Sequence, residues 1–308
     1  MTYVIRRLLG IIPILLATWT LVFAVIEIIP GDPVNLMLAG RPASEEVRQN
    51  ERHRLGLDRP VVERYGFFLL RAAKGDFGES YWTRQPVAAM IAEQLPSTLA
   101  LACGGLIVGV VLGTLLGVAA GTRPNSIVDS GTMAVALVGI SLPSFWIGML
   151  LIYVFGQMLG WVPIVGSGFP ALILPSITVG LFLAGGLARL IRASIIDVMA
   201  QDYIRTARAK GLARWVVVYK HALRNAMIPP LTLLGIQFGI LIGGAVVTET
   251  VFARPGIGAM LVQAVLSKDQ PLVQALIVYT TSAYIVINLV VDLLYSAIDP
   301  RISLGKSA

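Results

Sequence analysis

The sequence predicts an all-α integral membrane protein with about six transmembrane helices and both termini in the cytoplasm. Hydrophobic residues make up 56% of the 308 residues and charged residues 13%, and the mean hydropathy is +0.80. A soluble domain carries about 25% charged residues, so roughly half of the usual charge is missing. The remaining charges are unevenly spread, because short charged segments alternate with apolar runs of about 20 residues, the length that crosses a membrane.

The first apolar run covers residues 8–29 and follows Arg6 and Arg7. A signal peptide also begins with positive charge, but its apolar core is about 7–15 residues long and precedes a cleavage site of small residues. This run is longer and ends in the turn-forming sequence Pro30-Gly31-Asp32-Pro33. We therefore expect residues 1–30 to form an uncleaved first span with a cytoplasmic N-terminus.

Residues 31–95 are predicted to form a folded extracytoplasmic segment, because nine basic residues are matched by nine acidic ones. Ser44, followed by two glutamates, is typical of a helix start, where a hydroxyl and early acidic residues satisfy the exposed amides. Pro60 interrupts that helix. Residues 61–73 are expected to form a second, amphipathic helix on the membrane surface.

Five further apolar runs, together with a polar segment at residues 191–230, predict a transmembrane core over residues 96–297. The runs cover residues 98–121, 131–158, 172–190, 231–251 and 272–295. Pro143 lies inside the run at residues 131–158, the third in the whole chain, and predicts a kink, because proline removes one backbone hydrogen bond. Glu27 and Glu249 lie near the outer ends of their spans, where we expect solvated carboxylates.

Basic residues favour one orientation of these spans. Thirteen Lys and Arg residues fall in the short segments placed inside, and only Arg254 and Lys268 fall in the short outer loops. Because cytoplasmic loops are enriched in Lys and Arg, this distribution predicts a cytoplasmic N-terminus and a cytoplasmic tail at residues 298–308. The net charge of +7 therefore reflects topology rather than a nucleic-acid partner.

Glycines recur at every fourth position in two of the runs. They are Gly105, Gly109, Gly113, Gly117 and Gly121 in the second run and Gly235, Gly239 and Gly243 in the fifth. Four residues is just over one helical turn, so these glycines form a smooth ridge that another helix can approach closely. The ridge is consistent with static packing and also with helices that slide during gating.

The segment at residues 191–230 is the only long polar stretch placed inside. Its composition before Gly211 favours a helix, and Gly211 then breaks or caps that helix. A second helical stretch from Arg214 to Arg224 is stopped by Pro229-Pro230. We expect a basic helix–glycine–helix elbow, too short to be a domain and suited to docking against a partner.

This elbow resembles the EAA loop of ABC importer permeases, whose pattern is Glu-Ala-Ala-x-x-x-Gly followed by apolar residues and proline. Arg205-Thr206-Ala207 stands in place of Glu-Ala-Ala, which is similar to the form found in peptide/nickel permeases of the dipeptide and oligopeptide type. The matching positions are Tyr203, Arg205, Thr206, Ala207, Arg208, Lys210, Gly211, His221, Asn225 and Pro229. Further resemblances run through residues 30–33, 75–80, 95–99, 141–148, 249–258 and 299–301.

The resemblance implies a type I ABC importer permease fold in a bacterial plasma membrane. It also implies a second homologous permease subunit, two cytoplasmic ATPase subunits that carry ATP and Mg, an extracytoplasmic substrate-binding protein and surrounding lipid. The small residues Thr206, Ala207 and Gly211 would allow close docking of the elbow on an ATPase. Arg205 and Arg208 either pair with acidic residues of that partner or follow the positive-inside bias.

The sequence encodes no recognisable enzyme site of its own. Gly305-Lys306-Ser307 resembles the end of a phosphate-binding loop, but Pro300 stands where that motif needs its first glycine. His53 and His221 fall on opposite sides of the membrane, and Cys103 lies alone in an apolar run, so we expect no metal site and no cofactor in this chain. Nickel or haem import by the same architecture, an ATPase-independent channel or porter, and a membrane-embedded enzyme are the alternative functions.

Overall fold

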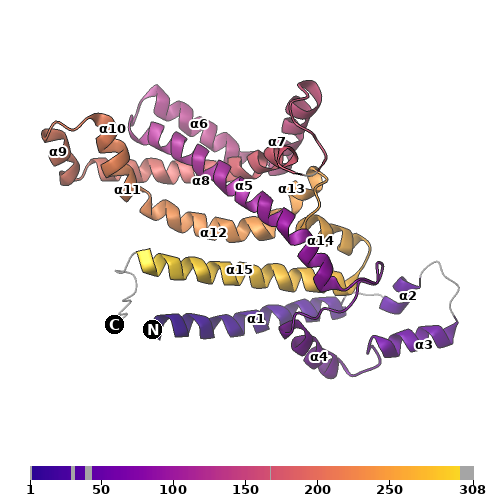
Figure 1. Cartoon of the computed structure of the whole chain (residues 1–308). Helices are drawn as coiled ribbons and strands as arrows, with labels where there is room; N and C mark the ends of the chain where they lie inside the picture. Colours follow the sequence, from indigo (N-terminus) through magenta and orange to yellow (C-terminus); the bar gives the residue numbers. More distant parts are fainter. Residues whose placement is uncertain (1, 29–31, 39–43, 167, 299–308) are drawn as a thin grey trace. The chain divides into compact units, whose positions relative to one another are not determined.

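The computed structural model describes residues 2–28, 32–38, 44–166 and 168–298, and these residues are almost entirely helical (Figure 1). The elements, of which η1 and η2 are π-helical, are α1 (Thr2–Ile28), α2 (Pro33–Met37), α3 (Glu45–Arg54), α4 (Val61–Ala73), α5 (Val87–Gly121), α6 (Ile127–Ser141), α7 (Ser144–Leu151), η1 (Ile152–Met158), α8 (Pro170–Met199), α9 (Asp202–Ala209), α10 (Arg214–Val216), η2 (Val217–Ala222), α11 (Leu223–Ala226), α12 (Ile228–Gly244), α13 (Val246–Val251), α14 (Ile257–Leu266) and α15 (Gln270–Ile298). The predicted all-α class is confirmed.

Four described helices, α1, α5, α8 and α15, are long and apolar enough to cross a membrane. A fifth crossing arises if α6 and the continuous α7–η1 segment count as one broken span. α12 is also apolar, and its 17 residues are slightly fewer than the roughly 20 that a span needs. Against the expected number of about six spans, the described residues supply four helices of spanning length, or five spans if the bent pair counts as one.

Several helices extend beyond the apolar runs that predict them. α5 begins at Val87 although its run begins at residue 98, and α8 continues to Met199 although its run ends at residue 190. A helix satisfies its backbone bonds internally, so it can continue after the apolar composition stops. The predicted start of the polar segment at residue 191 is therefore wrong, because the first nine residues of that segment belong to α8.

The third apolar run, residues 131–158, is not one helix. α6 ends at Ser141, α7 begins after Pro143, and the two helical segments are bent by 104°. Proline lacks an N–H and clashes with the carbonyl four residues earlier, so the predicted kink at this position is confirmed and is large enough to divide the span.

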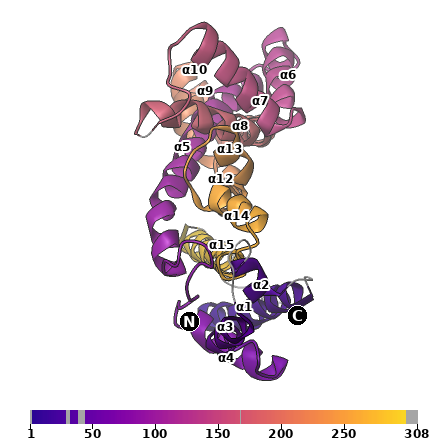
Figure 2. The ribbon, with the colours of Figure 1, turned by 90° about the vertical axis from the view of Figure 1, so that its right-hand side faces the viewer.

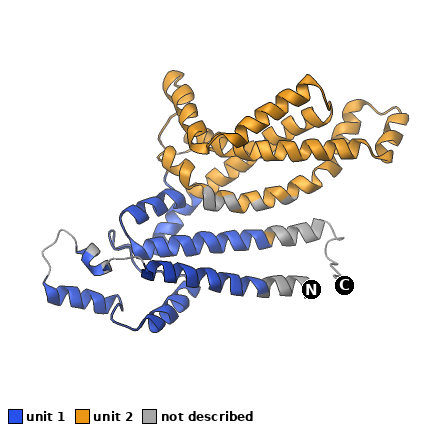
Figure 3. Cartoon of the chain, turned by 180° about the vertical axis from the view of Figure 1, so that it is seen from behind, with its two compact units in different colours: residues 1–96, 255–289 blue, residues 97–254, 290–308 orange. Residues whose placement is uncertain are grey.

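The described chain forms two compact units, one within residues 1–96 and 255–289 and the other within residues 97–254 and 290–308 (Figure 3). In the first unit, the ring of Phe23 on α1 lies 5.4 Å from that of Tyr65 and 5.6 Å from that of Phe68 on α4. The helix predicted at residues 61–73 is confirmed with those bounds. The predicted helix start at Ser44 is also confirmed, since its hydroxyl accepts a hydrogen bond from the amide of Val47.

In the second unit, α8 packs against both α5 and α6 (Figures 1 and 2). The glycine ridge of α5 faces α8: a Cβ added at any of its five glycines would lie 2.6–2.8 Å from a side-chain atom of α8. The facing pairs are Gly105 with Val179, Gly109 with Leu183, Gly113 with Leu187, Gly117 with Ile191 and Gly121 with Ile195. Both series advance by four residues, so the helices run parallel and the ridge serves close packing within the chain. Gly235, Gly239 and Gly243 lie on α12, where the expected second ridge stays a prediction.

Two acidic residues of the second unit are buried. Asp129 near the start of α6 receives two hydrogen bonds from the Arg192 guanidinium of α8, at 2.5 and 2.7 Å. Glu249 of α13 is fully buried and accepts a hydrogen bond of 2.6 Å from the Thr98 hydroxyl. The expectation of a solvated carboxylate is therefore wrong for Glu249. It holds for Glu27, which is exposed in the first unit.

Candidate docking elbow

The elbow comprises residues 200–227, between the end of α8 and the start of α12. Within it, α9 is followed by a turn and then by the continuous helical stretch α10–η2–α11. The predicted helix–glycine–helix arrangement is confirmed. The second helical stretch contains a π-helical turn, η2, that composition did not indicate.

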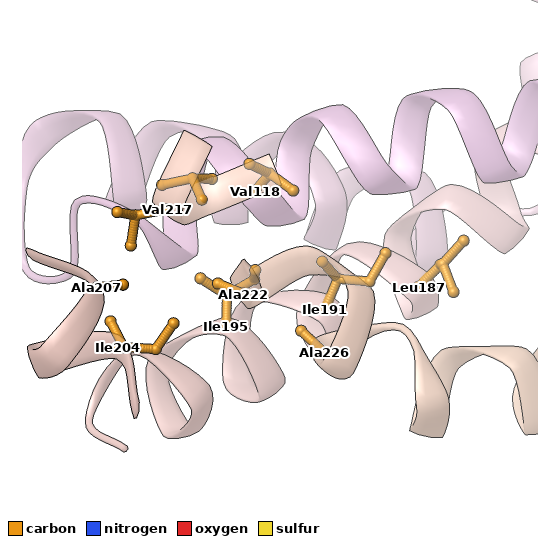
Figure 4. Packing of buried hydrophobic residues seen from close by; sticks show 10 residues of the cluster. Val118, Leu187, Ile191, Ile195, Ile204, Ala207, Val217, Ala222 and Ala226 are labelled. Atoms are coloured by element: carbon orange, nitrogen blue, oxygen red, sulfur yellow. The ribbon is translucent and has the colours of Figure 1, made fainter. Parts of the chain in front are cut away.

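α9 has one buried face and one exposed face. Ile204 is fully buried and Ala207 is 7% exposed, and both contribute to an apolar cluster with α5, α8, η2 and α11 (Figure 4). Arg205, Thr206 and Arg208 lie on the exposed side. The expectation that Ala207 offers a small surface to a partner is therefore wrong, because Ala207 faces the interior and its small side chain allows α9 to pack on this chain.

Gly211 terminates α9 through a specific backbone arrangement. Its φ is +76°, a left-handed conformation that side-chain-bearing residues rarely adopt. The amide of Gly211 donates to the carbonyl of Arg208 at 2.9 Å, and the amide of Leu212 donates to that of Ala207 at 3.4 Å. These two bonds form a Schellman motif, which satisfies carbonyls at the helix end. The predicted role of Gly211 in the bend is confirmed.

Two side-chain contacts fix the elbow to its surroundings. The Asn225 amide of α11 donates a hydrogen bond of 2.7 Å to the Tyr203 hydroxyl of α9. The Arg214 guanidinium donates a bond of 2.9 Å to the carbonyl of Thr122, which follows the last residue of α5. The first contact closes the elbow on itself, and the second joins it to the end of a spanning helix.

The exposed side of the elbow is basic. Arg205, Arg208, Lys210, Lys220 and Arg224 are all exposed. Arg205 lies 3.4 Å from Asp202, one helical turn away, and an exposed pair of this kind contributes little stability. The guanidinium of Arg208 contacts the Met199 sulfur at 3.8 Å. The charges therefore face outward rather than hold the elbow together.

The remaining predicted positions differ in setting. Thr206 donates its hydroxyl to the carbonyl of Asp202 at 3.0 Å, within α9 itself. His221 is half-buried on η2, and Pro229 is exposed in the first turn of α12. Proline is favoured there because the first helical amides have no partner in the helix. Neither His221 nor Pro229 lies on α9, so the predicted site residues form two groups.

Sequence reasoning missed two exposed aromatic residues of the elbow. Trp215 and Tyr219 lie one turn apart, are largely exposed, and line a groove against α5. Their position between basic residues in a short polar segment is the sequence feature that could have identified them. Within the ranges that the structure describes, no group of three or more His, Cys, Asp or Glu residues is arranged to hold a metal ion. Gly305-Lys306-Ser307 lies outside the described residues.

Comparison with known proteins decides the family. Residues 109–304 match the family described as the binding-protein-dependent transport system inner membrane component. Residues 1–102 match the separate N-terminal segment of such membrane components. The chain belongs to this family. It is the membrane-spanning permease subunit of an ABC importer of the inner membrane, and the predicted resemblance is confirmed.

Relatives and solved structures agree with this assignment. The glutathione transport system permease protein GsiC of Escherichia coli K12 is 46% identical over 303 residues, covering 98% of this permease and 99% of GsiC. GsiC of Shigella dysenteriae serotype 1 matches with the same values. A crystal structure of an amino acid ABC transporter with histidines matches at a TM-score of 0.51 and 17% identity, covering 69% of this permease and 94% of that chain. The inward-facing MetNI methionine ABC transporter matches at a TM-score of 0.53 and 21% identity. This match covers 68% of this permease and 96% of that chain. The fold is that of type I importer permeases.

Proposed function

We propose that this permease imports short peptides or peptide-like molecules, with its elbow oriented to the cytoplasm and docked on an ATPase subunit. The GsiC relatives, which are 46% identical, are named as permeases of a glutathione transport system. Glutathione is a peptide-like molecule. The arginine-rich form of the elbow from Tyr203 to Gly211 is similar to that of peptide permeases. The name of these relatives supports a peptide-like substrate over nickel or haem, whereas the form of the elbow is shared by peptide and nickel permeases.

The observation that carries the docking role is the construction of α9. The apolar cluster under Ile204 and the Schellman motif at Gly211 hold this helix in place, so its exposed side is presented as a rigid basic surface. Arg205 and Arg208 on that surface match the charge of an acidic groove, and charge complementarity favours such pairing. ATP hydrolysis is then supplied by the partner, and this chain needs no ATP or Mg site.

The complete importer would contain this chain, a second permease subunit, two ATPases and an external binding protein. Affinity purification from native membranes in mild detergent, followed by mass spectrometry, tests this composition. We expect two ATPase chains and a second, similar permease to co-purify. Recovery of a homo-oligomer alone would contradict the proposal and favour an ATPase-independent porter.

Uptake into proteoliposomes that contain the purified complex, with its binding protein outside and ATP inside, tests the substrate. We expect ATP-dependent accumulation of a radiolabelled di- or tripeptide. Accumulation of nickel or haem with no peptide uptake would overturn the substrate assignment and leave the permease assignment intact.

A further inference from the structure

A groove of about 650 Å³ lies between the second half of α5 and the α10–η2 stretch of the elbow. Its floor is apolar, formed by residues that include Leu115 and Val118 of α5. Arg123, Arg214, Trp215 and Tyr219 line its other sides. These four side chains come from two separate parts of the chain, and the proposed docking role of α9 uses none of them.

The apolar floor continues along α5 as a stripe. Ile107, Val111 and Leu115 follow one another at four-residue steps and are 63%, 51% and 61% exposed. Residues four apart lie on one face of a helix, so the stripe forms one apolar strip of a spanning helix. It lies away from the glycine ridge, whose positions face α8. A strip of this kind matches an extended acyl chain that lies along the helix.

Two arginines lie at the end of the stripe. Arg123 is exposed and follows α5 by two residues, and Arg214 is held next to it by the hydrogen bond to the carbonyl of Thr122. Arginine presents a planar fork of donors that matches phosphate. No acidic residue lines the groove in the part of the chain that the structure describes, so the two cations give it a net positive charge.

Two aromatic residues line the same groove as the arginines. Trp215 and Tyr219 are separated by one helical turn and are 69% and 59% exposed. Such amphipathic rings are enriched at the level of lipid headgroups, at the boundary between hydrocarbon and water. The groove thus combines an apolar strip, aromatic side chains and a pair of cations, the three kinds of surface that the acyl chain, interfacial region and headgroup of a phospholipid contact.

We propose that this groove binds one anionic phospholipid of the cytoplasmic leaflet, with its phosphate on Arg123 and Arg214 and an acyl chain along the stripe. Basic pockets beside spanning helices on the cytoplasmic side suit such headgroups. The inference rests on the proposed cytoplasmic orientation of the elbow. Arg214, Trp215 and Tyr219 belong to the elbow and Leu115 to α5, so the lipid braces the elbow against a spanning helix.

The test uses the purified importer in nanodiscs that contain phosphatidylglycerol and phosphatidylcholine, followed by native mass spectrometry of the lipids that remain bound. Arg123→Gln removes one cation of the groove. Arg224→Gln is the matched control, because Arg224 is an exposed elbow arginine that does not line the groove. We expect Arg123→Gln to reduce retained phosphatidylglycerol about fivefold, the factor that corresponds to ~1 kcal/mol per basic residue. Arg224→Gln should leave retention unchanged.

Other outcomes would overturn the proposal. Equal losses in both variants would show a general effect of surface charge. Displacement of the lipid by soluble inorganic phosphate would show a simple anion site, and a protein cross-link from Tyr219→Cys in place of bound lipid would show that a partner subunit covers the groove. Lipid retention is measured without transport, so its failure is distinguishable from failure of peptide uptake.

Discussion

The two polar regions of this chain use their charges in opposite ways. Between residues 44 and 86, basic residues pair with acids of the same unit: Arg64 with Glu27 at 2.8 Å, and Arg71 with Asp76 at 3.1 Å. In the elbow, an apolar cluster, backbone hydrogen bonds and the bond from Arg214 to the Thr122 carbonyl hold the fold, and the arginines of α9 face outward. Charged residues that pair within the chain support the local fold, whereas the exposed basic residues of α9 are not required for its fold and are available to a partner.

The largest effect is expected from the apolar cluster under α9. Ile204→Ala removes a fully buried side chain, and we expect it to destabilise the elbow by about 2–5 kcal/mol. Limited proteolysis of the purified complex should then cut the elbow faster. Val47→Ala on α3, where the side chain is 44% exposed, is the control and should change little. Resistance of the Ile204 variant would show that the elbow is held by something other than this cluster.

Two substitutions at Gly211 show whether this position needs glycine for its backbone conformation or for close contact with the ATPase. Gly211→Val forces a branched side chain into a left-handed conformation, which costs about 1–2 kcal/mol, and we expect uptake to be lost. Asparagine tolerates this conformation, and a Cβ at residue 211 meets no atom within 4 Å. Uptake should therefore persist in Gly211→Asn. Loss of uptake in a well-folded Gly211→Asn variant would instead assign Gly211 to the contact surface with the ATPase.

A smaller effect is expected from the Tyr203–Asn225 contact. Tyr203→Phe removes the acceptor of one hydrogen bond, and we expect a loss of about 0.5–1.5 kcal/mol in local stability. Hydrogen–deuterium exchange of α9 and α11 should increase together. Tyr153→Phe on η1, an exposed position, provides the comparison. Faster exchange in α9 alone would show that the contact does not join the two helices.

The smallest effect is expected from the ion pairs of the first polar region. The Arg71 guanidinium and the amide of Gly78 hold the pKa of Asp76 below its ordinary value. A lowered carboxyl pKa stabilises the fold at neutral pH and stops doing so as the pH falls through the folded-state pKa. Hydrogen exchange of residues 71–78, corrected for intrinsic rates, should therefore rise at strongly acidic pH. Arg71→Gln should weaken this pH dependence but leave the part that the Gly78 amide supplies, and an exposed pair contributes at most about 1 kcal/mol.

Local features could be predicted from the sequence, and long-range ones could not. The bend at Gly211, the helix at residues 61–73 and the division at Pro143 follow from residue preferences over a few positions. The four-residue spacing predicted a smooth glycine face on α5, but the α8 residues that face it lie 74 positions later in the chain (Gly105 with Val179) and had no local signature.

The errors have physical causes in particular residues. The fourth apolar run ends at residue 190, yet α8 continues to Met199, and Arg192 in this extension pairs with Asp129 of α6, a partner that the sequence did not reveal. Ala207 was placed on the docking surface by motif alone. Its spacing of three from Ile204 puts both side chains on one helix face, and the apolar character of that face decides that it is buried.

The central claim is that the exposed side of α9 contacts an ATPase. Site-specific cross-linking tests it most directly, with single cysteines introduced in a Cys103→Ser background at Arg205 on α9 and at Lys74, an exposed residue after α4. We predict that Arg205→Cys cross-links to an ATPase subunit in the purified importer and that Lys74→Cys does not. Absence of the Arg205 cross-link in an importer that retains its ATPases, or an equal yield from Lys74, would contradict the docking role of the elbow.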